Sequence, residues 1–296
     1  MAYLGELSAL FTATLWSGSS LAFSAAVVRV GSVQVNITRL MMACLLLGTT
    51  VLVLGFDLSV SGSQILNLCL SGLAGLVLGD SFLFKAYQEV GARISMLIMS
   101  IAPALSAFLA YLFLGESLSL LGILGIVVTL SGIALVVVER GSPGGPTHRI
   151  ISSGVMYAFL AALGQAVGLI FAKEAFLEAD LNAMVATLVR VLFAAIVLLP
   201  VMTAARRYRN PFTVYRRDRS ALGFTTLGAI LGPFLGITFS LIAVANTKVG
   251  IAATLMAMPP IIMLPMVKVF QKEVLNWKAI VGAFVSVAGV AILFLR

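Results

Sequence analysis

The sequence predicts an all-α integral membrane protein with ten transmembrane helices, arranged as two inverted five-helix repeats. Composition, long apolar runs and an internal repeat each support this prediction. Of the 296 residues, 61% are hydrophobic and 10% are charged, and the mean hydropathy is +1.13. A soluble domain carries about 25% charged residues. The composition therefore indicates a chain that lies in a lipid bilayer.

Apolar runs define the individual helices in order. A membrane-spanning helix needs about 20 mostly apolar residues. Charged residues and Gly, Pro, Asn and Asp clusters separate such runs, and most of the separators are short enough to make successive helices antiparallel neighbours. The runs cover residues 4–27, 34–55, 63–84, 92–114, 118–138, 152–173, 182–204, 221–243, 249–270 and 275–295.

The chain matches itself when it is shifted by 157 residues. Residues 75–138 then fall on residues 232–295, with sixteen identities among 64 pairs. Glycine, proline and glutamate matches are harder to obtain by chance than matches of Leu, Val or Ala. These pairs include Gly75/Gly232, Gly79/Gly236, Phe82/Phe239, Ala86/Ala243, Met99/Met256, Pro103/Pro260, Glu116/Glu273, Leu118/Leu275, Gly125/Gly282 and Gly132/Gly289.

The repeat divides the chain into two halves. The first covers residues 1–138, the linker 139–151 and the second 152–296, and the segment Arg39–Ala43 in the first half resembles Arg190–Ala194 in the second. Because five is an odd number, the second half must start on the opposite side of the membrane. Inverted repeats of this kind place a binding site at their interface and work by alternating access. The repeat therefore predicts a transporter rather than an enzyme.

The basic residues predict the orientation. Nineteen Lys and Arg residues against eleven acidic residues give a net charge of +8. Fourteen of the basic residues fall on one side of the predicted bundle and three on the other. By the positive-inside rule this places both termini outside the inner or plasma membrane. Basic loops beside lipid also account for the charge without a nucleic-acid partner, and the N-terminal apolar run is interpreted as a first span rather than a signal peptide.

Several chemistries have no support in the sequence. Cys44 and Cys69 lie inside apolar runs and favour neither a disulfide framework nor a metal site. His148 stands in a polar stretch away from any candidate nucleophile. No GxSxG, HExxH, P-loop or GxGxxG motif is present. We expect no catalytic residues, no metal and no cofactor.

A set of motifs resembles a known family. The residues Ala86-Tyr87, Gly91-Ala92, Ser95, Pro103 and Leu114-Gly115-Glu116, followed by a glycine-rich helix, are similar to the EamA-like module of the drug/metabolite transporter superfamily. The module recurs as Ala243, Gly250–Ala253, Pro260 and Glu273. The resemblance implies a ten-helix secondary transporter whose cavity is walled by helices 1–4 and 6–9. Members are often drawn with cytoplasmic termini, whereas the charge distribution of this chain predicts the opposite.

Three ionisable residues lie within predicted spans. Arg39 and the matching Arg190 either attract a carboxylate or phosphate, or reach a nearby interface or the end of a neighbouring helix. Asp80 either couples protons to transport or pairs structurally near a helix end. Its counterpart in the second half is Ile237, so the repeat is asymmetric at this position.

Polar residues at mid-depth are further candidates for substrate contacts. The first helix has Trp16 and small polar residues but no mid-depth acid, whereas small multidrug exporters of the superfamily use a glutamate there; this argues against cationic drugs. Small residues at these depths equally favour plain helix packing. The substrate-binding candidates are Trp16, Ser19, Asn36, Arg39, Ser95, Tyr157, Gln165, Arg190, Ser240 and Thr254.

Prolines interrupt the predicted fourth and ninth helices. Pro103, Pro259 and Pro260 each remove a backbone donor and free a carbonyl, so they serve either as hinges or only to shape the helices.

The leading functional hypothesis is a secondary active transporter that exports or exchanges a small polar metabolite, such as an amino acid or a related zwitterion or anion. Multidrug efflux is the alternative, with Trp16, Met96, Met99, Met256 and Met258 as its lining. From another class, a membrane lipid enzyme or a structural subunit stays open. The expected partners are a small-molecule substrate and the lipid bilayer, and the protein is expected to be a monomer or homodimer.

Overall fold

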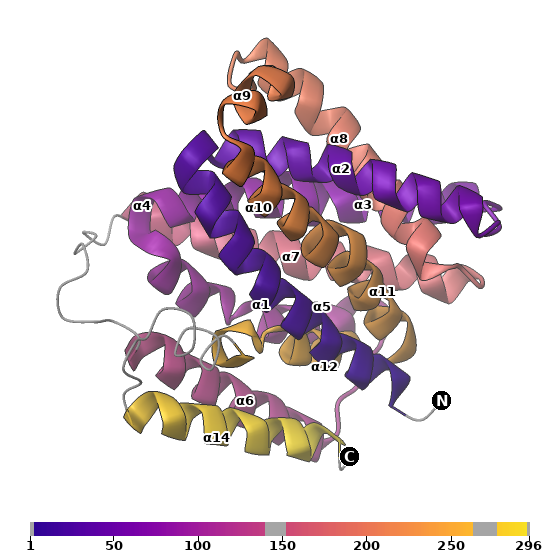
Figure 1. Ribbon diagram of the computed structural model, residues 1–296. Coiled ribbons are helices and arrows are strands. Elements are labelled where there is room, and N and C mark those ends of the chain that lie inside the picture. The colour runs from indigo at the N-terminus through magenta and orange to yellow at the C-terminus, as the bar shows by residue number, and fades with distance from the viewer. Residues whose placement is uncertain (1–2, 140–151, 263–276, 295–296) are drawn as a thin grey trace.

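A computed structural model describes residues 3–139, 152–262 and 277–294, and every regular element within these ranges is helical (Figure 1). The elements are α1 Leu4–Val30, α2 Ser32–Val53, α3 Gly62–Gly72, η1 Leu73–Gly79, α4 Asp80–Met99, α5 Ala102–Leu114, α6 Leu120–Glu139, α7 Ser152–Glu178, α8 Ala183–Ala204, α9 Pro211–Arg217, α10 Arg219–Ala229, η2 Ile230–Gly236, α11 Ile237–Asn246, α12 Val249–Met256 and α14 Trp277–Phe294.

Six helical segments in the described ranges are long and apolar enough to cross a membrane. They are Leu4–Val30, Ser32–Val53, Gly62–Ala86, Ser153–Glu178, Ala183–Ala204 and Arg219–Asn246. Four shorter apolar helices, Ala102–Leu114, Leu120–Leu135, Val249–Ile262 and Ile280–Phe294, accompany them. Each predicted apolar run overlaps one of these segments. The prediction of an all-α membrane protein is confirmed at this level.

Short connections set the antiparallel order of the helices. A single residue, Gly31, separates α1 from α2, and its φ of 88° lies in a region that favours glycine. Ser61 caps α3, because its hydroxyl accepts a hydrogen bond from the Gln64 N–H while the Gln64 side chain accepts one from the Ser61 N–H. Asn182 caps α8 in a similar way, with its side chain accepting from Met184 and Val185. These caps fix where the membrane-spanning segments begin.

The predicted boundary between the third and fourth runs is wrong. Helical structure continues from Gly62 through η1 to Met99, and the break lies at residues 100–101 instead. The polar residues 85–93, at which the prediction separated two helices, are compatible with helical backbone. The break falls just before Pro103, the second residue of α5, where a missing N–H removes no helical hydrogen bond.

Two π-helical segments occur at matching positions of the sequence repeat. The segment η1 covers Leu73–Gly79 and η2 covers Ile230–Gly236, so the 157-residue shift matches the first and last residues of the two segments. The break before Pro103 likewise matches a break at residues 257–258 before Pro259 and Pro260. Segments of π-helix are rare and frequently lie at functional sites. The repeated sequence thus carries the same local irregularities in both halves.

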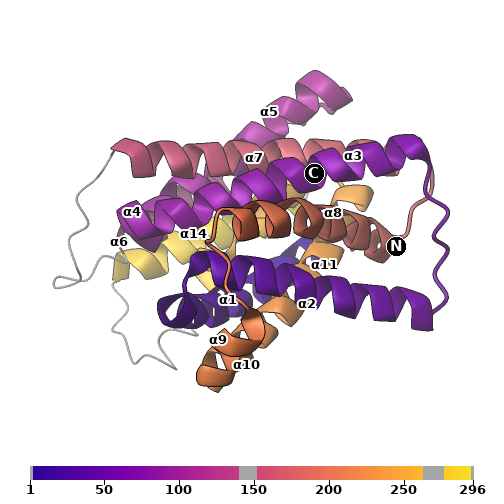
Figure 2. The same ribbon diagram turned by 90° about the horizontal axis from the view of Figure 1, so that it is seen from above.

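Helices from the two halves pack against each other in corresponding pairs. The helix α1 lies against α10, η2 and α11, while α7 lies along α3, η1 and α4 (Figure 2). The pairs α2 with α8, α5 with α12, and α6 with α14 complete the arrangement. The buried apolar core joins residues from both halves, including Leu40, Leu68, Val191 and Leu255.

Small residues bring α6 and α14 into close contact at one edge of the bundle (Figure 1). A Cβ on Gly132 would lie 2.5 Å from the carbonyl oxygen of Gly282, and a Cβ on Gly289 would lie 2.9 Å from that of Gly125. Ser286 donates a hydrogen bond of 3.1 Å to the Thr129 carbonyl oxygen. From Gly125 to Gly132 along α6, the facing residues of α14 run backwards from Gly289 to Gly282. The two helices are therefore antiparallel.

Candidate functional site

A buried ion pair joins α2 to the first residue of α4. The guanidinium of Arg39 donates through Nη2 to Asp80 Oδ2, and each residue is only 9% exposed. The chain positions Asp80 directly after η1, whose last glycine, Gly79, packs closely on α7. The structure thus brings together two residues that the sequence singled out separately.

Gln165 of α7 holds the second oxygen of this carboxylate. Its Nε2 donates to Asp80 Oδ1 over 3.0 Å and to the Gly75 carbonyl oxygen over 3.2 Å. Gly164 and Gly168, on either side of Gln165, allow α7 to approach the backbone of η1, where an added Cβ would lie within 3.1 Å of backbone atoms. The close approach of α7 to η1 therefore places the amide on Asp80.

Aromatic rings and an asparagine complete the surroundings of Arg39. The Cζ atom of Arg39 lies 5.2 Å from the ring centroids of both Phe23 and Phe84. Its Nε donates to Asn36 Oδ1 over 3.0 Å. Cation–π contacts and charge-assisted hydrogen bonds offset the cost of burying this cation. Sequence reasoning missed Phe23 and Phe84, which no polar signal distinguishes.

Arg190 lies beside the same cluster without a counter-ion of its own. It is 4% exposed, and its Nε lacks a hydrogen-bond partner in the described ranges. A Cβ on Gly75 would lie 3.5 Å from Arg190 Nη2 and 3.6 Å from Gln165 Oε1, so Arg190 reaches the glycine to which Gln165 donates. The α3 residue Gly72 also packs on the Arg190 carbonyl oxygen.

The cluster formed by Asn36, Arg39, Asp80, Gln165 and Arg190, hereafter the charge cluster, carries one net positive charge. Two guanidinium groups face a single carboxylate, and a buried cation without a partner is energetically costly. Such a cluster has the charge to hold an anion. No group of three or more His, Cys, Asp or Glu side chains suited to a metal occurs among the described residues.

Four predicted substrate contacts lie outside the charge cluster on other helices. The hydroxyls of Ser19, Ser240 and Thr254 donate within their own helices, to the carbonyl oxygens of Trp16, Ile237 and Gly250. Trp16 packs on η2, where a Cβ on Gly236 would lie 2.5 Å from its Nε1. Gly79 and Gly236 are matched in the repeat, and Gln165 packs on Gly79 as Trp16 packs on Gly236.

Tyr157 takes part in a separate contact nearer the start of α7. Its hydroxyl accepts a 2.6 Å hydrogen bond from Lys85, whose Nζ lies 4.1 Å from the ring centroid. The ring also stacks on Phe82 at 5.9 Å. Ser95 is buried in α4. Neither residue is a member of the charge cluster.

The predicted hinge prolines all lie at helix starts. Pro103 is near the start of α5, and Pro259 and Pro260 open the helical turn at residues 259–262. Two other prolines lie inside helical segments, Pro200 in α8 and Pro233 in η2.

Lys173 is a further buried cation, and the sequence does not predict its position inside the bundle. It lies in α7, and its ammonium donates to the carbonyl oxygens of Val244, Ala245 and Thr247 at the end of α11, over 2.8, 3.4 and 3.2 Å. The sequence signal was present, since Lys173 follows the apolar stretch of α7. This cation stabilises the negative end of a helix.

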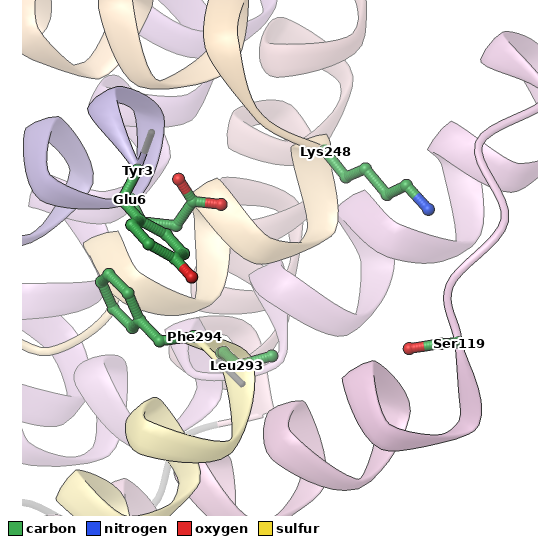
Figure 3. A pocket seen from close by; sticks show the side chains of 6 residues that line it. All are labelled: Tyr3, Glu6, Ser119, Lys248, Leu293 and Phe294. Atoms are coloured by element: carbon green, nitrogen blue, oxygen red, sulfur yellow. The ribbon is translucent and has the colours of Figure 1, made fainter. Parts of the chain in front are cut away.

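A cavity of about 280 Å³ opens at the end of the bundle where α1 begins and α14 ends (Figure 3). Its lining residues are Tyr3, Glu6, Ser119, Lys248, Leu293 and Phe294. Glu6 accepts a 2.9 Å hydrogen bond from the Thr247 hydroxyl, and Lys248 donates to the Ser117 carbonyl oxygen. The cavity is separate from the charge cluster, and these polar groups connect helices around it.

The basic connection between α8 and α10 is held in place by polar contacts. Gln34 of α2 accepts from the Arg209 N–H and donates to the Arg209 carbonyl oxygen, over 3.1 and 3.2 Å. Asp218 caps α10, and its pKa is lowered chiefly because its carboxylate accepts a hydrogen bond from the Ala221 N–H, with the Arg29 guanidinium also beside it.

Known proteins resemble this chain in part of its sequence or in its fold. The uncharacterized transporter YxxF of Bacillus subtilis (strain 168) is 32% identical over 88 residues, which are 30% of this chain and 28% of that protein. A solved crystal structure, described only as that of a protein, has a TM-score of 0.81 at 17% identity over 100% of this chain and 98% of that chain. This second likeness bears on the fold alone.

The model of the EamA-like transporter family matches residues 3–138 and again residues 152–295. The two matches together cover most of the chain. The protein belongs to the EamA-like transporter family and is a multi-pass membrane protein.

Proposed function

We propose that this protein is a secondary active transporter that moves a small polar metabolite, an amino acid or a related zwitterion or anion, by efflux or exchange. The observation that carries the proposal is the charge cluster. Ionisable residues inside a membrane protein are costly and mark substrate or proton pathways. Here they lie where helices of both halves of the chain meet.

The proposal includes ten membrane spans in two inverted repeats, with residues 1–138 and 152–296 as the halves and residues 139–151 as the linker. Support comes from the two family matches, the π-segments at equivalent residues and the antiparallel packing of α6 on α14. Two inverted halves with a site between them give alternating access when one half moves against the other.

The sign of the charge cluster favours an anionic or zwitterionic substrate. Two guanidinium groups and one carboxylate attract a carboxylate or phosphate group more than a cation. A multidrug exporter of lipophilic cations would gain little from this excess of positive charge. The methionines Met256 and Met258 of the alternative lining are buried in apolar clusters, which supports a packing role for them.

Asp80 is the proton-coupling candidate. Its carboxylate is held by Arg39 and Gln165. A proton on Asp80 would neutralise the carboxylate and weaken its attraction for Arg39, which links protonation to a rearrangement of α2 against α4. The prolines at the starts of α5 and of the turn at 259–262 are the proposed hinges for the same movement.

Both termini are proposed to lie outside the cell membrane. Tyr3 and Phe294 approach to 5.5 Å between ring centroids, so the start of α1 and the end of α14 share one end of the bundle. Cysteine residues introduced at Met1 and Arg296 should react with an impermeant reagent in intact cells. Labelling only after the cells are opened would contradict this orientation.

Transport is tested by a growth screen and then by flux. Cells that express the protein should gain resistance to toxic amounts of one small carboxylate or amino acid, and the purified protein in liposomes should exchange that solute saturably. The Arg190→Gln variant serves as the inactive control. Absence of saturable flux for every solute in the panel would favour a membrane protein of another class.

A further inference from the structure

The two intramembrane arginines occupy equivalent positions in the two halves. Arg39 is the eighth residue of α2 and Arg190 is the eighth residue of α8. Both are buried, and α2 packs directly on α8. The repeat therefore presents one cationic side chain from each half to the interior of the same bundle.

The residues that should balance these cations differ. Asp80 is the first residue after η1 and binds Arg39. The residue at the same place after η2 is Ile237, which is also buried. An isoleucine cannot accept a hydrogen bond, so the second half has the cation but lacks its carboxylate.

The acid whose charge acts on Arg190 is Asp80, which is already paired with Arg39, so Arg190 shares a counter-ion and has none of its own. Ile237 begins α11, which packs on α8, the helix of Arg190. The hydroxyls that follow Ile237 in α11 are engaged within the helix, since Thr238 donates to the Phe234 carbonyl oxygen and Ser240 donates to that of Ile237. Arg190 forms no ion pair or side-chain hydrogen bond within the described ranges, and its Nε is buried without a partner.

We propose that the carboxylate of the transported substrate binds Arg190 as the carboxylate of Asp80 binds Arg39. This inference rests on the proposed transport function and names the chemistry of its site. The Arg39–Asp80 pair is the template for the geometry, because a guanidinium pairs with a planar carboxylate through directed hydrogen bonds. Gln165 Oε1, on the same face of Gly75 as Arg190 Nη2, offers an acceptor to the ammonium group of an amino acid.

If the Arg39–Asp80 pair is a template for the site at Arg190, a carboxylate introduced into the chain at the equivalent position should occupy that site. In the variant Ile237→Asp, the new side chain stands where the repeat places a partner for Arg190. We expect the melting temperature of the ligand-free protein to rise by about 2–4 °C, because the buried cation gains a counter-ion. The variant should also lose any response to added carboxylate. Ile237→Asn is the matched control, with similar size and no charge, and should keep that response.

The experiment measures melting temperatures of the purified full chain in detergent, with L-alanine, L-glutamate, lactate or inorganic phosphate added at millimolar concentrations. At least one of the three carboxylate probes should raise the melting temperature of the wild type by about 2 °C or more. A rise with phosphate alone would overturn the carboxylate assignment. A rise that persists in Ile237→Asp would overturn the proposed place of binding.

A second variant keeps the inference testable if Ile237→Asp fails to fold. Arg190→Gln should abolish the response to carboxylate. It should leave the ligand-free melting temperature unchanged or higher, since it removes an unpaired buried cation. A large fall in the ligand-free melting temperature would instead assign Arg190 a structural role and overturn the inference.

The outcome separates this inference from the proposed function. Suppose that flux is saturable and that the Arg190→Gln and Ile237→Asp variants keep the carboxylate response. This result would support the transport function and reject the proposed binding site. A wild type that responds to none of the four probes rejects the site as well, while the flux measurement decides independently whether the protein transports.

Discussion

The guanidinium of Arg39 and the carboxylate of Asp80 form a buried ion pair between α2 and the first residue of α4. The 157-residue shift matches Asp80 with Ile237, and the Nε of the equivalent cation, Arg190, is buried without a hydrogen-bond partner in the described ranges. The duplicated bundle is thus symmetric in its helices and asymmetric in its charges.

Neutralising one member of the buried pair should strongly destabilise the protein. Arg39→Gln and Asp80→Asn should each lower the free energy of unfolding by about 3 kcal/mol, because each removes the charge with which its buried partner forms an ion pair. The double variant should lose less than the sum of the two. Denaturation of the purified protein measures this cycle, and strictly additive losses would contradict a direct interaction.

An exposed pair provides the control. Arg29 and Asp218 lie 3.2 Å apart, with side-chain exposures of 46% and 29%. Solvent screens such pairs, so Arg29→Gln should leave the melting temperature unchanged.

Asp80→Asn should also remove the dependence of transport on an imposed proton gradient. An amide cannot take up a proton in this pH range, so a carboxylate that couples protons cannot be replaced by asparagine. Flux into liposomes at several internal and external pH values measures the effect. If the variant retains the pH dependence of the wild type, the role of Asp80 is structural.

The close contact between α6 and α14 predicts sensitivity at two glycines. Gly132→Ala and Gly289→Ala should each destabilise the protein by about 1–3 kcal/mol, because the added methyl group meets the facing backbone. Gly223→Ala in α10, where a Cβ meets nothing within 4 Å, should be neutral or slightly stabilising. Equal stability of all three variants would contradict a close contact between α6 and α14.

Pro103→Ala should change the transport rate more than the stability. The break at residues 100–101 lies just before this proline, and a restored N–H would allow α4 and α5 to join. Comparison of flux with melting temperature measures the two effects. Pro200→Ala, inside α8, is the control, and loss of expression in Pro103→Ala alone would favour a structural role.

Apolar runs are sufficient to predict an all-helical chain with helices long and apolar enough to cross a membrane, because long apolar stretches cannot remain in water. The prediction of the boundary between the third and fourth runs is wrong for a physical reason. Polar residues such as Lys85 and Glu89 suggested a loop, yet they are good helix formers, and α4 continues to Met99.

The sequence identified Arg39, Asp80, Gln165 and Arg190 as candidates but could not pair them. Their proximity depends on the packing of α7 against η1 and of α2 against α8, which no local pattern encodes. Lys173 was missed because its role depends on the end of a helix distant in sequence, α11. The π-segments were not predicted either, although the matching glycines at both sites had pointed to equivalent structure.

Exchange flux in liposomes tests the central claim most directly. Wild-type protein loaded with an unlabelled small carboxylate or amino acid should accumulate the labelled form saturably, and Arg190→Gln should abolish this accumulation while Arg29→Gln retains it. Accumulation that is linear in concentration, or that is equal in wild type and Arg190→Gln, would contradict a carrier whose substrate binds at the charge cluster.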